Sequence, residues 1–183
     1  MERSSLAVAM TDITESRSAG SNFLRLFVIL FVSSFAVGLG TYWVLHSICG
    51  QAHVFASWFR MFNYHEQHHA QYIAVVAFIY AALTAGWATR WTPRGWRRHV
   101  SVLGVLVVTL LVSSALGGIL YALHDMQAGY FPSWERQVAA FRYYVGAGLA
   151  LGWILVTFSF PLNLFAVPFA YVTAYYLPLR LKR

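Results

Sequence analysis

Long stretches without a charged residue constrain this chain more than any other feature of its sequence. The longest runs from Tyr143 to Leu179, 37 residues (143 to 179) without Asp, Glu, Lys or Arg. Of the 183 residues, 59% are hydrophobic and only 10% are charged. The polar surface that a soluble domain of this size needs is therefore missing. We expect an all-α integral membrane protein with a single membrane domain, residues 23–179.

Four apolar stretches are long enough for transmembrane helices, which need about 20 residues each. The first is longer than the core of a cleavable signal peptide, and no small-residue cleavage site follows it, so we expect it to remain as a span. The second begins early, because Asn63 and Glu66 match a capping box at a helix start. We expect a four-helix transmembrane bundle with spans at 23–45, 64–88, 100–123 and 143–160.

The last apolar stretch is too long for one span. As a single helix, residues 143–179 would extend about 55 Å, whereas the hydrocarbon core is about 30 Å thick. Pro161 removes a helix hydrogen bond and marks the expected break. The broken fourth helix then leads to a C-terminal re-entrant or interfacial helix, residues 162–179. Residues 1–22 are mixed polar and charged, and we expect a flexible cytoplasmic tail there, with a basic cytoplasmic tail at 180–183.

The positions of the basic residues predict the orientation. With four spans and a cytoplasmic N-terminus, 3 of the 13 Lys and Arg residues lie outside (Arg60, Arg136 and Arg142), which leaves 10 inside. Five full spans would reduce this asymmetry to about 7 against 6. We therefore expect a multi-pass protein of the plasma membrane, the inner membrane of a bacterium, with both termini cytoplasmic. Topology and anionic lipids explain the net charge of +7 without nucleic-acid binding.

Histidines are concentrated on the outer side of this topology. Three of them, His65, His68 and His69, stand at i, i+3 and i+4 and would share one face of a continuous helix. Imidazole and carboxylate groups at such spacing suit zinc, copper or iron. The helix dipole at a helix N-terminus also favours the neutral, metal-binding form of histidine. The candidate metal ligands are His65, His68, His69, His46, His53, His124, Asp125 and Glu66.

Other interpretations of the histidines stay open. Histidine is amphipathic, so these residues also suit a polar rim at the membrane interface, or a cluster that becomes charged below about pH 6.5. A haem between His46 and His124 is a further possibility. The role of the single cysteine, Cys49, is equally open between a ligand and a small interfacial residue.

The segment His65-x-x-His68-His69 resembles one histidine box of the membrane fatty-acid desaturases and hydroxylases, which hold iron with several such boxes. This chain has no second box, so the resemblance covers only these residues and we carry no oxygenase activity over. Ser-His-Asp order, a GxSxG elbow and a CxxC motif are also absent. The sequence therefore favours binding over catalysis.

Three functional hypotheses follow. The leading one is an accessory or assembly subunit of a membrane complex, with a membrane-protein partner or a second copy of the chain. In length, span number, internal termini and basic tail the chain is similar to the immunity proteins of pore-forming colicins, which implies a protective role as a variant of this hypothesis. The alternative is a metal-binding protein for metal handling or redox chemistry. The third is a small transporter, which would need the break at Pro161 to line a cavity.

Glycines predict close helix packing. Gly148 and Gly152 have the small-xxx-small spacing, and Gly117 and Gly118 lie in the third expected span. Small residues at such positions allow helix backbones to approach closely in a membrane. We expect these glycines to serve packing within the bundle rather than a dimer face.

Overall fold

The computed structural model describes residues 2–49, 60–91, 93–158 and 162–181, with side chains in 20–48, 63–91, 93–151 and 164–180. These residues form six helices, and no strand occurs among them. The all-α prediction is confirmed. The helices are α1 (Glu2–Cys49), α2 (Arg60–Gln67), α3 (His69–Arg90), α4 (Trp96–Gln127), α5 (Trp134–Phe158) and α6 (Leu162–Leu181).

Three of these helices are long and apolar enough to cross a membrane. They are Gly20–Ile48 within α1, the whole of α3 and the whole of α4. The expected spans 23–45 and 100–123 lie inside the first and third of them. The chain is therefore a multi-pass membrane protein by length and composition, with three candidate spans among the described residues.

The predicted second span, 64–88, is not one continuous helix. α2 ends at Gln67 and α3 begins at His69, because His68 adopts φ −113° and ψ 38°, which is not helical. The expected start at Asn63 is also wrong, since α2 begins at Arg60 and Asn63 lies inside it. The interruption changes the direction in which the residues on either side of His68 point.

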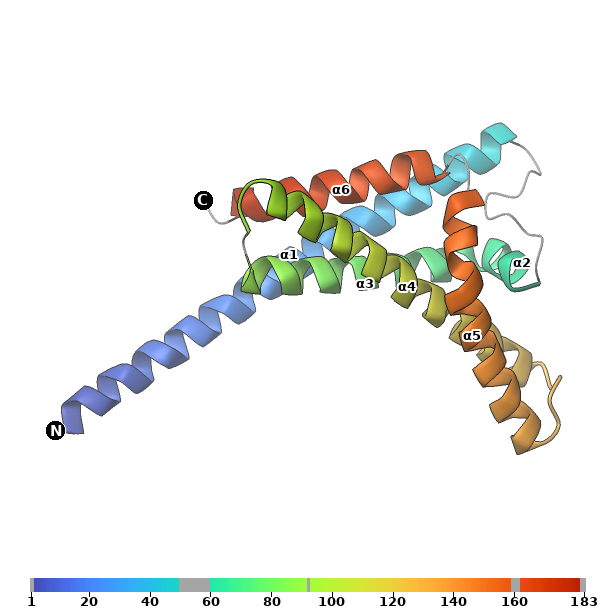
Figure 1. Cartoon of the computed structure of the whole chain (residues 1–183), viewed down its shortest axis with the longest axis horizontal. Coiled ribbons are helices and arrows are strands. Elements are labelled where there is room, and N and C mark those ends of the chain that lie inside the picture. The colour runs from blue at the N-terminus through green and yellow to red at the C-terminus, as the bar shows by residue number, and fades with distance from the viewer. Residues whose placement is uncertain (1, 50–59, 92, 159–161, 182–183) are drawn as a thin grey trace.

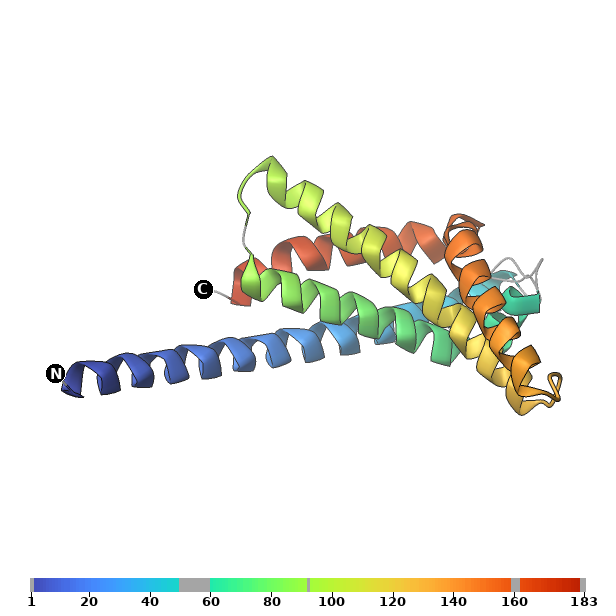
Figure 2. The same cartoon turned by 60° about the horizontal axis from the view of Figure 1, so that its bottom comes forward.

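The long helices run along the molecule, except for α5. In Figures 1 and 2, α3 and α6 lie beside the second half of α1, α4 packs on α3 and α6, and α5 runs obliquely across one end. α6 packs against α1, α3 and α4. α5 ends at Phe158 and α6 begins at Leu162, so two helices occupy the long apolar stretch; Pro161 itself lies outside the described residues. α1 begins at Glu2, so residues 2–22, expected as a tail, continue this helix.

The two ends of the molecule differ in their residues. The histidine end carries α2 and the turn between α4 and α5 (Figure 1); the residues that define it are His46, His65, His68, His69 and His124. The arginine end carries the turn between α3 and α4 and the C-terminal end of α6; the residues that define it are Arg90, Arg94, Arg97, Arg98 and Arg180.

The buried core is made of two clusters that correspond to these ends. The cluster near the histidine end is rich in tyrosine and consists of Tyr42, Leu45, Tyr64, Tyr72, Ile73 and Tyr121. The cluster toward the arginine end contains small residues of α3 that let neighbouring helices approach, and consists of Leu26, Leu30, Tyr80, Ala81, Ala85, Ala88, Val102 and Ala174. Polar rings are therefore buried near one end and alanines near the other.

α4 and α5 meet backbone to backbone. A Cβ atom added at Gly118 would collide with the carbonyl of Tyr144, and one added at Gly148 would collide with the carbonyl of Ser114. Only glycine permits this approach at either position. The prediction that Gly118 and Gly148 serve packing within the bundle is confirmed. The side chain position of Gly152 lies outside the described residues.

Candidate functional site

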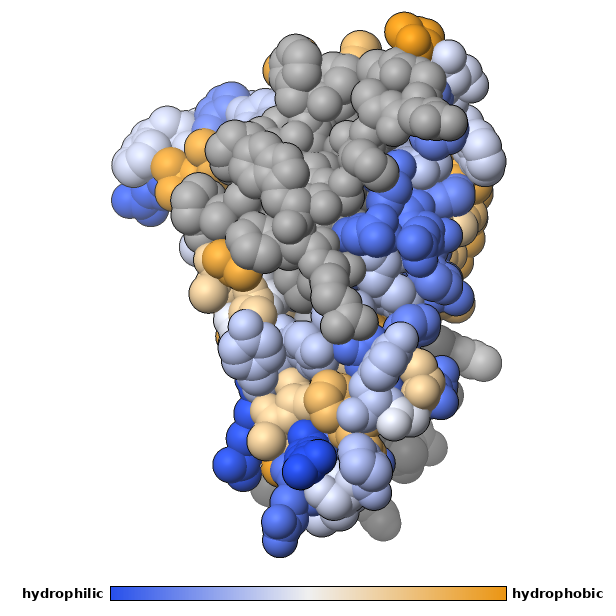
Figure 3. Space-filling view, turned by 90° about the vertical axis from the view of Figure 1, so that its right-hand side faces the viewer, coloured by the Kyte–Doolittle hydropathy of each residue, from blue (hydrophilic) through white to orange (hydrophobic). Residues whose placement is uncertain are grey.

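The histidine end gathers most of the ionisable side chains that sequence analysis singled out. Seen end-on, it presents hydrophilic residues beside hydrophobic ones (Figure 3). Four of the five histidines that define this end fall into two groups with different neighbours, and His65 is packed separately in the core. One group surrounds Glu66, and the other lies around Tyr64 and Asp125.

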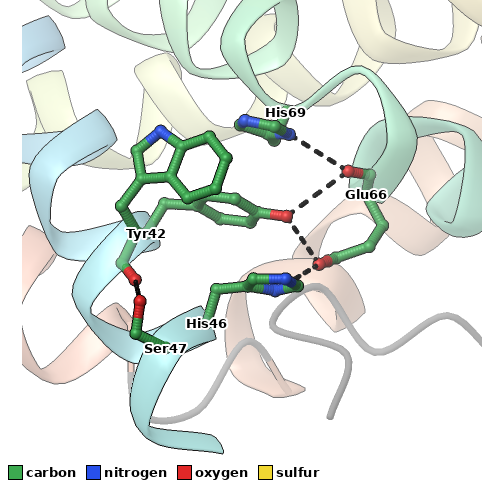
Figure 4. Close-up of polar contacts among 6 residues, drawn as sticks. Tyr42, His46, Ser47, Glu66 and His69 are labelled. Atoms are coloured by element: carbon green, nitrogen blue, oxygen red, sulfur yellow. Dashed lines mark hydrogen bonds and ion pairs between the residues drawn. The ribbon is translucent and has the colours of Figure 1, made fainter. Parts of the chain in front are cut away.

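Glu66 is the centre of the first group (Figure 4). The hydroxyl of Tyr42 donates to its Oε1 at 2.8 Å, and Nδ1 of His46 lies 4.0 Å from the same oxygen. Nδ1 of His69 donates to the Glu66 backbone carbonyl at 3.3 Å. The Tyr42 ring also stacks on both imidazoles, with ring centroids 4.1 Å from His69 and 5.7 Å from His46. These contacts connect α1, α2 and α3.

Asp125 is a buried carboxylate whose partners come from two helices. Its exposed fraction is 2%. The hydroxyl of Tyr144, in α5, donates to Oδ2 at 2.9 Å, and Nδ1 of His124 lies 3.4 Å from Oδ1. A buried carboxylate is costly unless such hydrogen bonds replace water. The two contacts satisfy Asp125 within the chain.

His68 and His124 lie close together, and the Nδ1 atom of each ring faces an oxygen acceptor. Nδ1 of His68 donates to the carbonyl of Tyr64 at 3.1 Å, and Nδ1 of His124 faces Asp125. Their ring centroids are 5.8 Å apart, and the Tyr64 ring contacts both, at 4.4 Å and 4.8 Å. An acceptor at Nδ1 places the proton there and leaves Nε2 with a free lone pair. The same arrangement orients the histidine ligands of metal sites.

His65 is packed as a core residue. Its exposed fraction is 2%, its ring stacks on Tyr72 with centroids 4.3 Å apart, and its Nδ1 has no partner among the described residues. Nε2 lies 2.9 Å from the place where a Cβ of Gly117 would be, so this glycine makes room for the ring. Burial, together with the neighbouring His68, lowers the pKa of His65 from 6.5 to about 3. His65 is therefore neutral at physiological pH.

His65, His68 and His69, which were expected to share one helical face, have different neighbours. His65 stacks on Tyr72, His68 on Tyr64 and His69 on Tyr42. The part of the chain that the structure describes contains no group of three or more His, Cys, Asp or Glu residues able to hold a metal ion. His53 and the side chain of Cys49 lie outside the described residues. The expectation that one helical face presents three ligands depended on a continuous helix through His68.

Sequence reasoning missed the tyrosines of this site. Tyr42 and Tyr144 bind the two carboxylates, and Tyr64 lies between two histidines. None of these tyrosines is among the candidate site residues named from the sequence. A usable signal was present, because a carboxylate near the end of a span needs a donor and tyrosine is the abundant donor in this chain.

No protein-family model, curated protein or solved structure matches this chain. Its function is therefore argued from the geometry of the described residues.

Proposed function

We propose that this chain is a non-enzymatic membrane protein that acts by binding, as an accessory or assembly subunit of a larger membrane complex. The observation that carries the proposal is where the ionisable residues lie. In the three candidate spans, Asp, Glu, Lys, Arg and His residues occur only near the ends. An ion or proton pathway normally needs such groups inside the membrane. Their absence from the middle of these spans favours binding over transport.

The two carboxylate contacts at the histidine end support the same proposal. Glu66 is held by Tyr42 and Asp125 by Tyr144, so each acid joins two helices of the chain. Such contacts stabilise the positions of α2 relative to α1 and of α5 relative to α4. A scaffold with fixed helix positions suits a subunit that presents a surface to a partner.

We also propose that α6 is the fourth span and that both termini are cytoplasmic. α6 has 20 residues, which correspond to about 30 Å of helix and to the hydrocarbon thickness. It packs beside α1, α3 and α4. In this arrangement the membrane is the inner membrane of a bacterium and the arginine end faces the cytoplasm, which agrees with the positive-inside rule. α5 then lies obliquely on the outer side.

Site-specific photocrosslinking in native membranes tests the binding function. A photoreactive residue replaces Trp134 or Tyr143, which are 77% and 71% exposed on α5, or Val107 as a control on α4. We expect one discrete adduct with a different membrane protein from the α5 positions and none from Val107. Adducts with a pore-forming toxin would identify the protective variant of the same function. Adducts only with a second copy, or none at all, would contradict the subunit proposal.

Metal binding is the second candidate, and one observation favours it. His68 and His124 lie with ring centroids 5.8 Å apart, each with Nδ1 occupied by an acceptor. Two imidazole nitrogens at about 2.0 Å from one zinc or copper ion fit this separation. Elemental analysis of the purified protein tests the site. We expect stoichiometric metal in the wild type and in His99→Ala, and loss of it in the double variant His68→Ala/His124→Ala; an unchanged content in that variant would refute this site.

A further inference from the structure

The arginine end contains a buried cation. Arg98, in the first turn of α4, is 5% exposed. Its Nη2 donates to the backbone carbonyl of Tyr175 in α6, and its Nε is buried without a partner among the described residues. The guanidinium carbon lies 5.0 Å from the centre of the Tyr175 ring and 5.7 Å from that of Trp87. Three helices therefore enclose one positive charge.

Among the side chains that the structure describes (20–48, 63–91, 93–151 and 164–180), no carboxylate balances Arg98. Glu66 and Asp125 have their partners at the histidine end, and Glu135 lies in the first turn of α5 at that same end. The ion pairs found among the described side chains involve only histidines with Glu66 and Asp125. A buried charge is costly unless an opposite charge or several hydrogen bonds compensate it. Aromatic faces and one carbonyl compensate it only in part.

The surroundings of Arg98 are also positive. Arg94 and Arg97 are exposed beside it, and Arg90 and Arg180 lie at the neighbouring ends of α3 and α6. α4 begins after Gly95, which has φ +61° and provides no side-chain cap, so the positive end of the helix dipole adds to this field. An anion with several oxygen atoms is the complementary ligand, because guanidinium groups bind phosphate with two parallel hydrogen bonds.

The surface next to this cluster is apolar. Trp96, Val100 and Leu103 of α4 are 72%, 51% and 52% exposed, and they continue from the arginines along the helix. A free phosphate ion has no apolar part that could contact this surface, whereas the acyl chains of a lipid would cover it. Basic pockets between transmembrane helices at the cytoplasmic surface are typical sites for anionic headgroups.

We propose that Arg98 and the arginines around it bind the phosphate headgroup of an anionic phospholipid, whose acyl chains lie along the exposed face of α4. The bound phosphate supplies the counter-charge that no described side chain gives the buried guanidinium. The lipid also contacts α4 beside its packing with α3 and α6, so it stabilises the arrangement of these helices.

Native mass spectrometry of the full chain tests this site. The protein is released from nanodiscs of phosphatidylcholine alone or mixed with phosphatidylglycerol. We expect the wild type to retain phosphatidylglycerol about tenfold more than phosphatidylcholine. This comparison needs no variant, and equal retention of the two lipids would overturn the proposal. Full displacement of phosphatidylglycerol by inorganic phosphate would instead assign the site to a free anion, which also overturns it.

Two variants locate the site. Arg98→Gln removes the charge, and we expect it to lose about tenfold of the retention of phosphatidylglycerol. Arg98→Lys keeps the charge without the planar fork, and we expect an intermediate loss. Arg142→Gln, an exposed arginine of α5 at the other end, is the matched control, and its retention stays at the wild-type level. An equal loss in Arg142→Gln and Arg98→Gln would mean a general charge effect and would refute the site at Arg98.

Discussion

The hydroxyl of Tyr144 in α5 lies 2.9 Å from Oδ2 of Asp125 in α4, and it donates a hydrogen bond to this buried carboxylate. The bond joins two helices that already meet at Gly118 and Gly148. The polar contact and the glycine contact lie on the same two helices, so each can be tested separately by a single substitution with a neighbouring control.

We expect Tyr144→Phe to lower the free energy of unfolding by about 1.5 to 3 kcal/mol, because a hydrogen bond to a charged, buried acceptor is lost. Tyr143→Phe is the matched control, since Tyr143 is adjacent and 71% exposed. Thermal unfolding in detergent measures both. Equal unfolding temperatures for the two variants would mean that the Asp125 contact contributes nothing to stability.

Gly118→Ala tests the contact between α4 and α5. The new methyl group would collide with the backbone of Tyr144, which cannot move as a side chain can, so we expect a loss of roughly 1 to 3 kcal/mol. Gly104→Ala is the control on the same helix, because a Cβ there meets nothing within 4 Å. Alanine is the better helix former, so the control is neutral or slightly more stable. If both variants keep the wild-type unfolding temperature, the close crossing is absent in the membrane.

The buried His65 predicts a pH dependence of stability. Burial and the nearby His68 lower its pKa from 6.5 to about 3 in the folded protein. Below about pH 6.5, His65 binds a proton in the unfolded chain but not in the folded chain. The free energy of unfolding therefore falls as the pH is lowered toward 3, by up to about 1.4 kcal/mol per pH unit.

Unfolding from about pH 8 to about pH 4 measures this effect in the wild type and in His65→Phe. The difference between the two proteins isolates the contribution of His65, because other groups titrate in both. We expect the variant to lose stability less steeply with falling pH. Parallel curves would show that His65 is hydrated and takes up its proton in the folded state.

Cysteine labelling tests the role of α6. In a Cys49→Ala background, single cysteines replace Glu135, Leu164 or Arg180, all of which are exposed, and intact cells are treated with a thiol reagent that does not cross the membrane. If α6 is the fourth span, Glu135→Cys and Leu164→Cys react in intact cells, and Arg180→Cys reacts only after permeabilisation. Protection of Leu164→Cys in intact cells would favour the expected span 143–160 with an interfacial helix after it.

Hydropathy was sufficient to predict the all-helical membrane class and, at three of the four expected places, a helix long and apolar enough to span a membrane. Runs of apolar residues define which segments enter a bilayer. It could not predict which helix lies beside which, since lipid is as apolar as the helix surfaces that pack together. The oblique α5 and the position of α6 beside α1 are consequences of such packing. The number of spans and an interfacial helix at 162–179 remain predictions.

The histidines and carboxylates of the candidate site could be named from the sequence, but their contacts could not. The spacing of His65, His68 and His69 predicts one shared face only if the helix continues, and the backbone of His68 interrupts it. The partners of the carboxylates come from residues far along the chain: Tyr42 is 24 positions from Glu66, and Tyr144 is 19 from Asp125. Local patterns do not contain such pairings.

The backbone contact of α4 and α5 also affects how the protein moves as a mechanical object. At the level of Gly118 and Gly148 the two helices leave no space for a lipid tail between them. A force applied to α5, whether by a bound partner or by an extracting protease, is therefore transmitted directly to α4. The two helices should enter and leave the bilayer together as one insertion unit, with the turn between them carrying little load.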